Sequence, residues 1–218
     1  ILNLEQLRKF KSLIERRKKG EPIAYLISKK EFWKDEFFVN KDVLIPRPDT
    51  EIIIEQVLKI YSKNVQSQIL DIGTGSGCII LSILKERKKC HGTGIDISKK
   101  AINLAKYNAK IQHIGNRIKF FNSDIDNFYR DKYDGKKEFI QCNVESNPFQ
   151  DKEFDFVIAS HILEHVDDPF HFCKELTRIG KRGYIEVPTP LWDNLVDGPH
   201  FVKYGHKWWV TFDDADNS

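Results

Sequence analysis

The feature that most constrains this sequence is an alternation of short apolar runs with segments of helical periodicity, which begins at Gln68. Apolar residues are contiguous in the runs, and they recur at spacings of three and four between them. The pattern predicts strands at residues 69–72, 94–97, 118–121, 154–159 and 184–187, and helices at residues 79–84, 101–109 and 172–179. Alternation of this kind is typical of an α/β fold, in which a mostly parallel sheet carries helices on both faces.

The beginning of the chain follows a different pattern. Leu4, Leu7, Phe10 and Ile14 recur at helical spacing, until residues 20–22 read Gly-Glu-Pro and end the pattern. A single helix of this length is marginal in water, so its apolar stripe needs a partner. Because the sequence contains no Met, even at position 1, we expect a fragment whose preceding sequence supplies that partner.

Short apolar and aromatic runs at residues 25–27, 37–39 and 43–45 predict two or three further strands. Pro46 and Pro48 then force an extended backbone. A helix is expected directly after them. Its expected N-cap is Asp49 or Thr50, and its expected buried face consists of Ile52, Ile53, Val57 and Ile60. We therefore divide the chain into a short helical and hairpin element, residues 1–50, and a main domain, residues 51–218.

Composition excludes several classes of protein. With 31% charged and 40% hydrophobic residues the chain is not disordered, and its net charge of +3 forms no basic stripe that favours direct nucleic-acid binding. No apolar run is long enough to span a membrane, so we expect a cytoplasmic protein. The four cysteines form no Cys-x-x-Cys pair and are interpreted as reduced, buried thiols; no metal site is expected.

A glycine-rich turn carries the strongest functional signal. Residues 71–77 read Asp-Ile-Gly-Thr-Gly-Ser-Gly between an expected strand and an expected helix, which is the context of a nucleotide-binding turn. Glycines without Cβ atoms allow a sharp turn and a close approach of the ligand to the backbone. Asp96 follows at the end of the next expected strand, where its carboxylate can accept hydrogen bonds from both hydroxyls of a ribose.

The kind of nucleoside follows from what the turn lacks. No Gly-Lys-Ser/Thr follows the glycines, which excludes a Walker-type phosphate site. An adenosine whose amino-acid tail lies over the glycines fits better. Asp124, after the third expected strand, then accepts a hydrogen bond from the adenine amino group, or alternatively is an ordinary helix cap.

These residues resemble the motifs of class I S-adenosylmethionine-dependent methyltransferases, whose fold is Rossmann-like. The resemblance implies S-adenosylmethionine as cofactor. It implies that the cofactor-binding residues are Asp71, Gly73, Thr74, Gly75, Ser76, Gly77, Asp96, Ile97 and Asp124.

A narrower resemblance covers about residues 1–125. Residues 20–26, 31–33, 43–51 and 71–78 resemble the release factor glutamine methyltransferases, and the run Ile-Pro-Arg-Pro-Asp-Thr-Glu at 45–51 is the specific part. This family methylates the side-chain nitrogen of the glutamine in the Gly-Gly-Gln loop of peptide chain release factors. The resemblance implies a release factor as partner, with residues 1–50 as the remnant of the element that recognises it.

The resemblance breaks at the family's Asn-Pro-Pro-Tyr motif, which holds the glutamine amide and which this sequence lacks. The nearest string is Ser-Asn-Pro-Phe at 146–149, so Asn147 and Pro148 are the candidate substrate-binding residues, and no catalytic residue is assigned. That string precedes the expected strand at 154–159, whereas the motif follows its strand in the family.

From about Asp126 onward the sequence instead resembles the methyltransferase type 11 group, which acts on small molecules and lipids. Residues 147–157, 163–166 and 168–169 carry this resemblance. In that group the position of Asn143 contacts the adenine, so Asn143 competes with Asp124 for one role, and residues 138–142 compete with 118–122 as third strand. We interpret the chain as a composite of two methyltransferase types with a join near residue 125.

Three functions stay open at this point. The favoured one is methylation of a release factor glutamine, the second is methylation of a small molecule or lipid, and the third is binding of a cofactor or partner without catalysis. One further string, His-Ile-Leu-Glu-His at 161–165, matches the spacing of inverted zinc peptidases. It directly follows a buried strand, so we interpret it as a loop over the cofactor rather than a zinc site.

Overall fold

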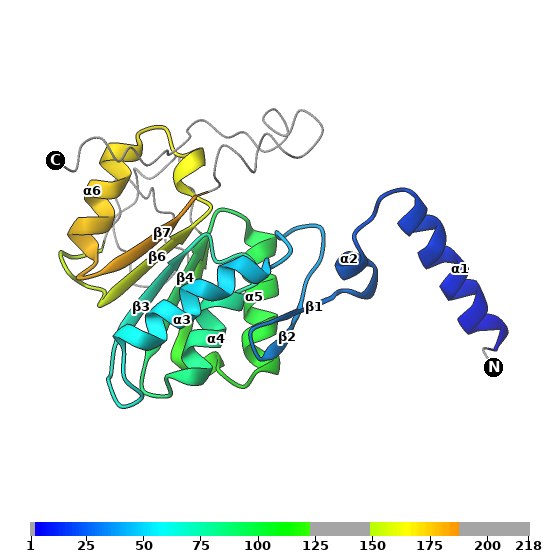
Figure 1. Ribbon diagram of the computed structural model, residues 1–218, viewed down its shortest axis with the longest axis horizontal. Coiled ribbons are helices and arrows are strands. Elements are labelled where there is room, and N and C mark those ends of the chain that lie inside the picture. Colours follow the sequence, from blue (N-terminus) through cyan, green and yellow to red (C-terminus); the bar gives the residue numbers. More distant parts are fainter. Residues whose placement is uncertain (1–2, 123–148, 188–218) are drawn as a thin grey trace, which may run out of the picture.

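A computed structural model describes residues 3–122 and 149–187 of the chain (Figure 1). Its α-helices are α1 (Leu4–Lys18), α2 (Ile23–Ile27), α3 (Glu51–Ile60), α4 (Cys78–Glu86), α5 (Lys99–Ile111) and α6 (Pro169–Ile179). Its strands are β1 (Lys29–Phe32), β2 (Asp35–Phe38), β3 (Gln68–Ile72), β4 (His91–Asp96), β5 (Ile118–Asn122), β6 (Phe156–Ser160) and β7 (Gly183–Glu186). Three single turns of 3₁₀ helix are η1 (Pro48–Thr50), η2 (Gly115–Arg117) and η3 (Leu163–His165).

The five strands β3 to β7 form one parallel sheet in the order β5-β4-β3-β6-β7. This confirms the α/β fold and each of the strands and helices predicted from residue 68 onward. The chain runs outward from β3 through β4 to β5 and then returns to place β6 on the other side of β3. The order therefore reverses between β3 and β6, and a crevice at the carboxyl ends of these strands is where sheets of this kind bind ligands.

Both faces of the sheet are buried, which explains why its strands are apolar runs rather than alternating patterns. Ile69 packs into a cluster with α3, α4 and α5, whereas its neighbour Leu70 packs into a second cluster with α6. Phe156 and Val157 of β6 divide between the two clusters in the same way. Figure 1 shows α6 on one side of the sheet and α3, α4 and α5 on the other.

The antiparallel hairpin β1–β2 packs beside α5, and Figure 1 shows it between the sheet and α1. Two of the strands predicted here are wrong. Residues 25–27 belong to helix α2, which starts after Pro22 and ends at Ser28 in a left-handed conformation. Residues 43–45 form no strand, because they lie between a turn closed by the Val43 N–H and Pro46, which has no N–H to donate.

The buried face of α3 differs from the prediction. Ile53 and Val57 are buried as expected, but Ile52 and Ile60 are exposed and Ile54 is buried in their place. Because apolar residues follow one another on this helix, spacing alone does not select the face that α4 covers. The predicted side-chain cap is also absent, since η1 precedes α3 and Thr50 makes no capping hydrogen bond.

Helix α1 buries none of its residues against the rest of the described chain. Its predicted apolar stripe is exposed, with 76% of the surface of Leu4 accessible. The N-terminus of the helix is nevertheless capped. The side chain of Asn3 accepts a hydrogen bond from the Gln6 N–H, and the side chain of Gln6 accepts one from the Asn3 N–H, which together form a capping box. Figure 1 shows α1 extending away from the sheet.

The cysteines of the described residues are free thiols. Cys78 and Cys90 are buried free thiols as predicted, whereas Cys173 is half-buried. No helix within residues 3–122 and 149–187 is long and apolar enough to cross a membrane. Several predictions lie outside the described residues, namely those on Asp124, Asn143, Asn147, Pro148, Cys142, the strand at 138–142 and the join near residue 125.

Candidate functional site

A cavity of about 280 Å³ lies at the carboxyl ends of β3, β4 and β6. This is the crevice that the strand order predicts. Its lining comes from residues 42–47, 72–76, 95–97 and 160–162, with Thr50, Cys78, Ile79 and Ala101. Six of the predicted cofactor-binding residues therefore line one cavity, namely Gly73, Thr74, Gly75, Ser76, Asp96 and Ile97.

The glycine turn between β3 and α4 is held by backbone hydrogen bonds. Gly73, Gly75 and Gly77 all have positive φ angles, of +68°, +54° and +81°, a conformation that residues with a Cβ rarely adopt. The Thr74 N–H donates to the carbonyl of Ile95 on β4 at 2.9 Å. The turn is thereby fixed to the end of the neighbouring strand.

Two of these glycines serve different purposes. A Cβ at Gly73 would lie 2.3 Å from Cδ1 of Ile162, so glycine allows the loop after β6 to pack closely on the turn, in a backbone conformation of φ +68° that already favours it. A Cβ at Gly75 would meet only the Gly73 carbonyl at 3.8 Å. Gly75 therefore faces open space in the cavity, where a ligand can approach its backbone closely.

Asp96 stands at the centre of the cavity wall. Its Oδ2 accepts from the Gly75 N–H and its Oδ1 from the Ser98 N–H, both at 2.8 Å. Burial raises the pKa of this carboxyl above its usual value, and the two N–H donors oppose that shift. Each oxygen of an ionised carboxylate has a further lone pair, so Asp96 can still accept hydrogen bonds from two hydroxyl groups.

Two of the predicted binding residues lie outside the cavity lining. Asp71 is 1% exposed and supports the turn from beneath, with Oδ2 accepting from Oγ1 of Thr74 at 2.7 Å. Its Oδ1 has no hydrogen-bond partner among the described residues, and burial raises its pKa to about 7. Gly77 packs against α5, since a Cβ there would lie 3.1 Å from Leu81 and 3.4 Å from Ala105. These two positions shape the turn and are not part of the cavity lining.

Two asparagines that the sequence analysis missed hold the site together. Asn108, 1% exposed on α5, donates to the carbonyl of Ser76 at 2.8 Å and also pairs with both the N–H and the C=O of Phe38 on β2. Asn122 at the end of β5 donates to the carbonyls of Asp96 and Ile97. A lone asparagine in a helix or strand gives no motif signal, so only the folded chain shows these contacts.

A second wall of the cavity, residues 42–47 with Thr50, was also missed as a binding element. Its signal was present in the sequence as the Ile-Pro-Arg-Pro run, which we used only for the resemblance. Tyr25 fixes this wall from outside by donating its hydroxyl to the carbonyl of Val43 at 2.7 Å. Arg47 is half-buried in it.

The third side of the cavity is the loop after β6. His161 has a positive φ of +57°, and its Nδ1 lies 3.5 Å from Oε1 of the buried Glu164, while its Nε2 lies 3.9 Å from Oε2 of Glu186. Ser160 donates to the same Glu186 oxygen at 2.6 Å. No group of His, Cys, Asp or Glu in the described part of the chain is arranged to hold a metal ion.

Comparison with known proteins identifies the family. A family model described as a methyltransferase domain matches residues 70–185, more than half of the chain. The chain belongs to this methyltransferase family. A second model, described as the PrmC N-terminal domain, matches residues 1–27, which include α1 and α2.

The methyltransferase chain also resembles curated relatives named release factor glutamine methyltransferase. It is 40% identical to the protein of Caulobacter vibrioides over 123 residues, 56% of this chain and 43% of the relative. It is 47% identical to the protein of Aliivibrio fischeri over 116 residues, which are 53% of this chain and 40% of the relative. It is 40% identical to the protein of Leptospira interrogans over 155 residues, which are 70% of this chain and 53% of the relative. The chain thus spans about half or less of the length of these relatives.

Membership of this family implies S-adenosylmethionine as the cofactor, and the cavity of the methyltransferase suits it. The ribose of the cofactor needs acceptors for two hydroxyls, and Asp96 has the lone pairs for both. The bare backbone at Gly75 leaves room that a Cβ would fill. Apolar side chains of Ile72, Ile95 and Ile97 complete the surroundings of a nucleoside.

Proposed function

We propose that this protein transfers the methyl group of S-adenosylmethionine to the side-chain nitrogen of a glutamine in a peptide chain release factor. One observation carries the proposal. Residues 45–48, the part of the sequence that most specifically resembles the release factor enzymes, form a wall of the same cavity as the glycine turn and Asp96. The two motifs are far apart in the sequence and meet at one cavity. Curated relatives named release factor glutamine methyltransferase support the proposal.

In this proposal the residues of the cavity bind and orient. Asp96 accepts hydrogen bonds from the ribose hydroxyls, and the turn from Gly73 to Ser76 with Ile97 forms the surface under the nucleoside. When bound, S-adenosylmethionine supplies a methyl group on a positively charged sulfur. An amide nitrogen is a poor nucleophile, so the protein contributes chiefly by positioning it and accepting its N–H hydrogen bonds.

Other roles remain predictions from the sequence. Asp124 or Asn143 is proposed to contact the adenine, and Asn147 and Pro148 the substrate. We propose residues 1–50 as the element that recognises the release factor, which accords with the family match at residues 1–27. The expected cytoplasmic location belongs to the same proposal, since it places the enzyme with this substrate.

A labelling experiment tests the proposed acceptor. The chain is incubated with S-adenosylmethionine carrying a radioactive methyl group and a release factor containing the Gly-Gly-Gln loop. We expect label in the release factor, and none when its loop glutamine is replaced by alanine. The variant Gly75→Val is the enzyme control, because its Cβ enters the cavity and meets only the Gly73 carbonyl at 3.8 Å; since the φ of +54° strains any residue with a Cβ, urea unfolding is measured to show that the variant is folded. Equal labelling of both release factors, or of neither, contradicts the proposal.

A second candidate function rests on the loop after β6. Where the release factor enzymes carry Asn-Pro-Pro-Tyr at the end of a strand, the cavity here is lined by Ser160, His161 and Ile162. This wall favours a small-molecule acceptor of the type 11 kind. Incubation with a metabolite and lipid extract tests it, with label in a small product as the expected result. Cofactor binding without any labelled product indicates instead a binding module.

A further inference from the structure

The charged side chains that line the cavity do not balance one another. Those that carry or can carry charge are Asp42, Arg47, Asp96 and His161. Asp42, Asp96 and His161 each have a hydrogen-bond or ion-pair partner. The side chain of Arg47 forms no ion pair or hydrogen bond with another described residue. The cavity therefore contains an arginine whose hydrogen-bonding groups are available to a ligand.

The other lining charges already have partners. Asp42 pairs with Lys100 at 3.3 Å, and Asp96 accepts two backbone N–H groups. His161 lies between two carboxylates, those of Glu164 and Glu186. An anionic ligand entering the cavity is therefore attracted to Arg47 rather than to these groups.

The backbone of Arg47 is held firmly, so the root of its side chain is fixed. Prolines on either side restrict its conformation, and it is extended, with φ of −94° and ψ of 142°. Its carbonyl accepts from the Thr50 N–H at 3.2 Å, which closes the turn of η1. The fixed backbone sets where the side chain starts, and the planar guanidinium carries paired N–H donors that suit bidentate binding of a carboxylate.

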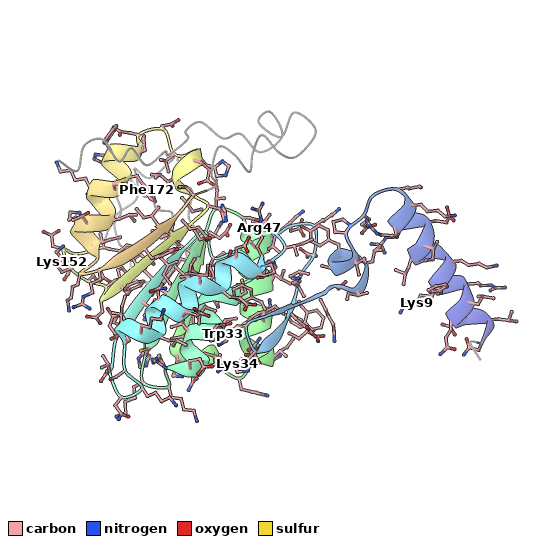
Figure 2. All side chains as sticks on the ribbon, viewed as in Figure 1. Lys9, Trp33, Lys34, Arg47, Lys152 and Phe172 are labelled. Atoms are coloured by element: carbon pink, nitrogen blue, oxygen red, sulfur yellow. The ribbon has the colours of Figure 1, made fainter. Side chains whose placement is uncertain are left out.

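Figure 2 shows where this arginine lies in the molecule. Arg47 is at the end of α3 that is near the carboxyl ends of the sheet strands, whereas Lys34 lies away from it, beside Glu86 at the end of α4. Lys34 pairs with Glu86 at 2.5 Å and does not line the cavity. Lys34 therefore offers a matched cation whose loss leaves the cavity unchanged.

We infer that Arg47 binds the carboxylate of the amino-acid tail of S-adenosylmethionine. The inference rests on the proposed use of this cavity for that cofactor. The tail carboxylate is the cofactor's only anionic group, since adenosine here carries no phosphate. With Asp96 at the ribose and Arg47 at the tail, two different parts of the cofactor are held by two walls of one cavity. A carboxylate on the methyl acceptor has the same chemistry, and the experiment separates the two sources.

Calorimetry with two ligands tests the inference. S-adenosylhomocysteine has the amino-acid tail, and 5′-methylthioadenosine has the same nucleoside and sulfur but no tail. We expect Arg47→Gln to weaken S-adenosylhomocysteine binding about 10- to 100-fold, the usual effect of losing hydrogen bonds to a charged group, and to leave methylthioadenosine binding unchanged. Arg47→Lys should recover part of the loss, and Lys34→Gln should bind both ligands as the unaltered protein does.

The outcomes are distinct. If Arg47→Gln weakens both ligands equally, the arginine only shapes the cavity, and the inference is overturned. It is also overturned if neither ligand is weakened, in which case a rise in the KM of the acceptor alone assigns Arg47 to the acceptor. An unaltered protein that binds neither ligand overturns the proposed function itself. Urea unfolding midpoints that agree among the variants show that folding is not the cause.

Discussion

The cavity has two walls that are built in different ways. The glycine-turn wall, defined here as residues 72–76 with Asp96, is fixed by short backbone contacts between adjacent strand ends. The N-terminal wall, residues 42–47 with Thr50, contains no regular strand and is held by side chains from distant elements, such as Tyr25. The first wall is thus dictated by local sequence, whereas the second exists only when the hairpin region is docked on the sheet.

Asn108 connects the two regions. Its amide forms hydrogen bonds with the backbone of Phe38 in the hairpin and with the carbonyl of Ser76 in the glycine-turn wall. Trp33 provides a second contact, since its backbone N–H donates a hydrogen bond to the side chain of Glu51 at the start of α3. The hairpin is therefore fastened to both the helix layer and the turn. The following predictions test how far the two walls depend on different contacts.

The largest expected effect is that of Gly73→Val in the glycine-turn wall. The new side chain adopts a φ of +68° that a β-branched residue avoids, and its Cβ overlaps the end of the Ile162 side chain, which has to shift. Strain and overpacking together should lower the free energy of unfolding by roughly 3 to 6 kcal/mol. Urea denaturation measures this. Gly115→Val is the control, because no atom lies within 4 Å of its Cβ position, and equal losses in both variants contradict the prediction.

A pH-dependent effect is expected from Asp71 beneath the same wall. Burial raises its pKa to about 7 in the folded protein, against about 4 for an unfolded chain, so between these values the folded state binds the extra proton. Its contribution to stability is therefore present at low pH and lost as the pH rises through 7, by about 4 kcal/mol at most. Asp71→Asn should remove this slope. The measurement is the difference in unfolding free energy between variant and unaltered protein at pH 5 and pH 8. A difference that does not change with pH shows the prediction to be wrong.

A smaller effect is expected from Asn108→Ala, which acts on the glycine-turn wall and on the hairpin that precedes the N-terminal wall. The change leaves the N–H and C=O of Phe38 and the C=O of Ser76 without their partner in a buried place, which should cost about 2 to 3 kcal/mol of stability. The affinity for S-adenosylhomocysteine should fall as well, because the hydrogen bond that holds the Ser76 carbonyl of the turn in place is lost. Asn64→Ala, at an exposed position, should change neither quantity. If affinity is retained in Asn108→Ala, the walls are independent.

The smallest effect is expected from removal of residues 1–19, which contain α1. This helix buries nothing against the described chain, so the N-terminal wall should form without it. We expect S-adenosylhomocysteine affinity within about twofold of the unaltered protein and a change in unfolding free energy below about 0.5 kcal/mol. A large loss of affinity would mean that α1 supports the wall. Labelling of the release factor, measured in parallel, reports separately on substrate recognition.

Much of the fold was predictable because its signals are local. From residue 68 onward, each strand in the described residues is a short apolar run and each helix has its own helical spacing of apolar residues, and these local patterns predict the strands and helices found there. The wrong predictions of strands and of a buried helix face fall where several apolar residues follow one another over a short stretch, at residues 25–27, 43–45 and along α3. In those places helix and strand patterns coincide, and tertiary packing chooses between them.

The same division applies to the site. The sequence singles out Gly73, Gly75 and Asp96 through glycine spacing and strand position, and the structure places all three in the cavity lining. Asn108 and Arg47 were not found from the sequence, since the role of a single polar side chain depends on what the fold brings next to it. Asp71 lies in the layer beneath the cavity lining, a placement that adjacency to a glycine motif does not reveal.

The two hydrogen bonds to Asp96 have a consequence for the energetics of recognition. Because the N–H groups of Gly75 and Ser98 already immobilise both oxygens, the carboxylate has no rotamer freedom left to lose when hydroxyl groups arrive. Association is then free of one of the ordering costs that usually weaken it. The acceptor is preorganised, so even a ligand with few polar contacts can be captured in a single orientation.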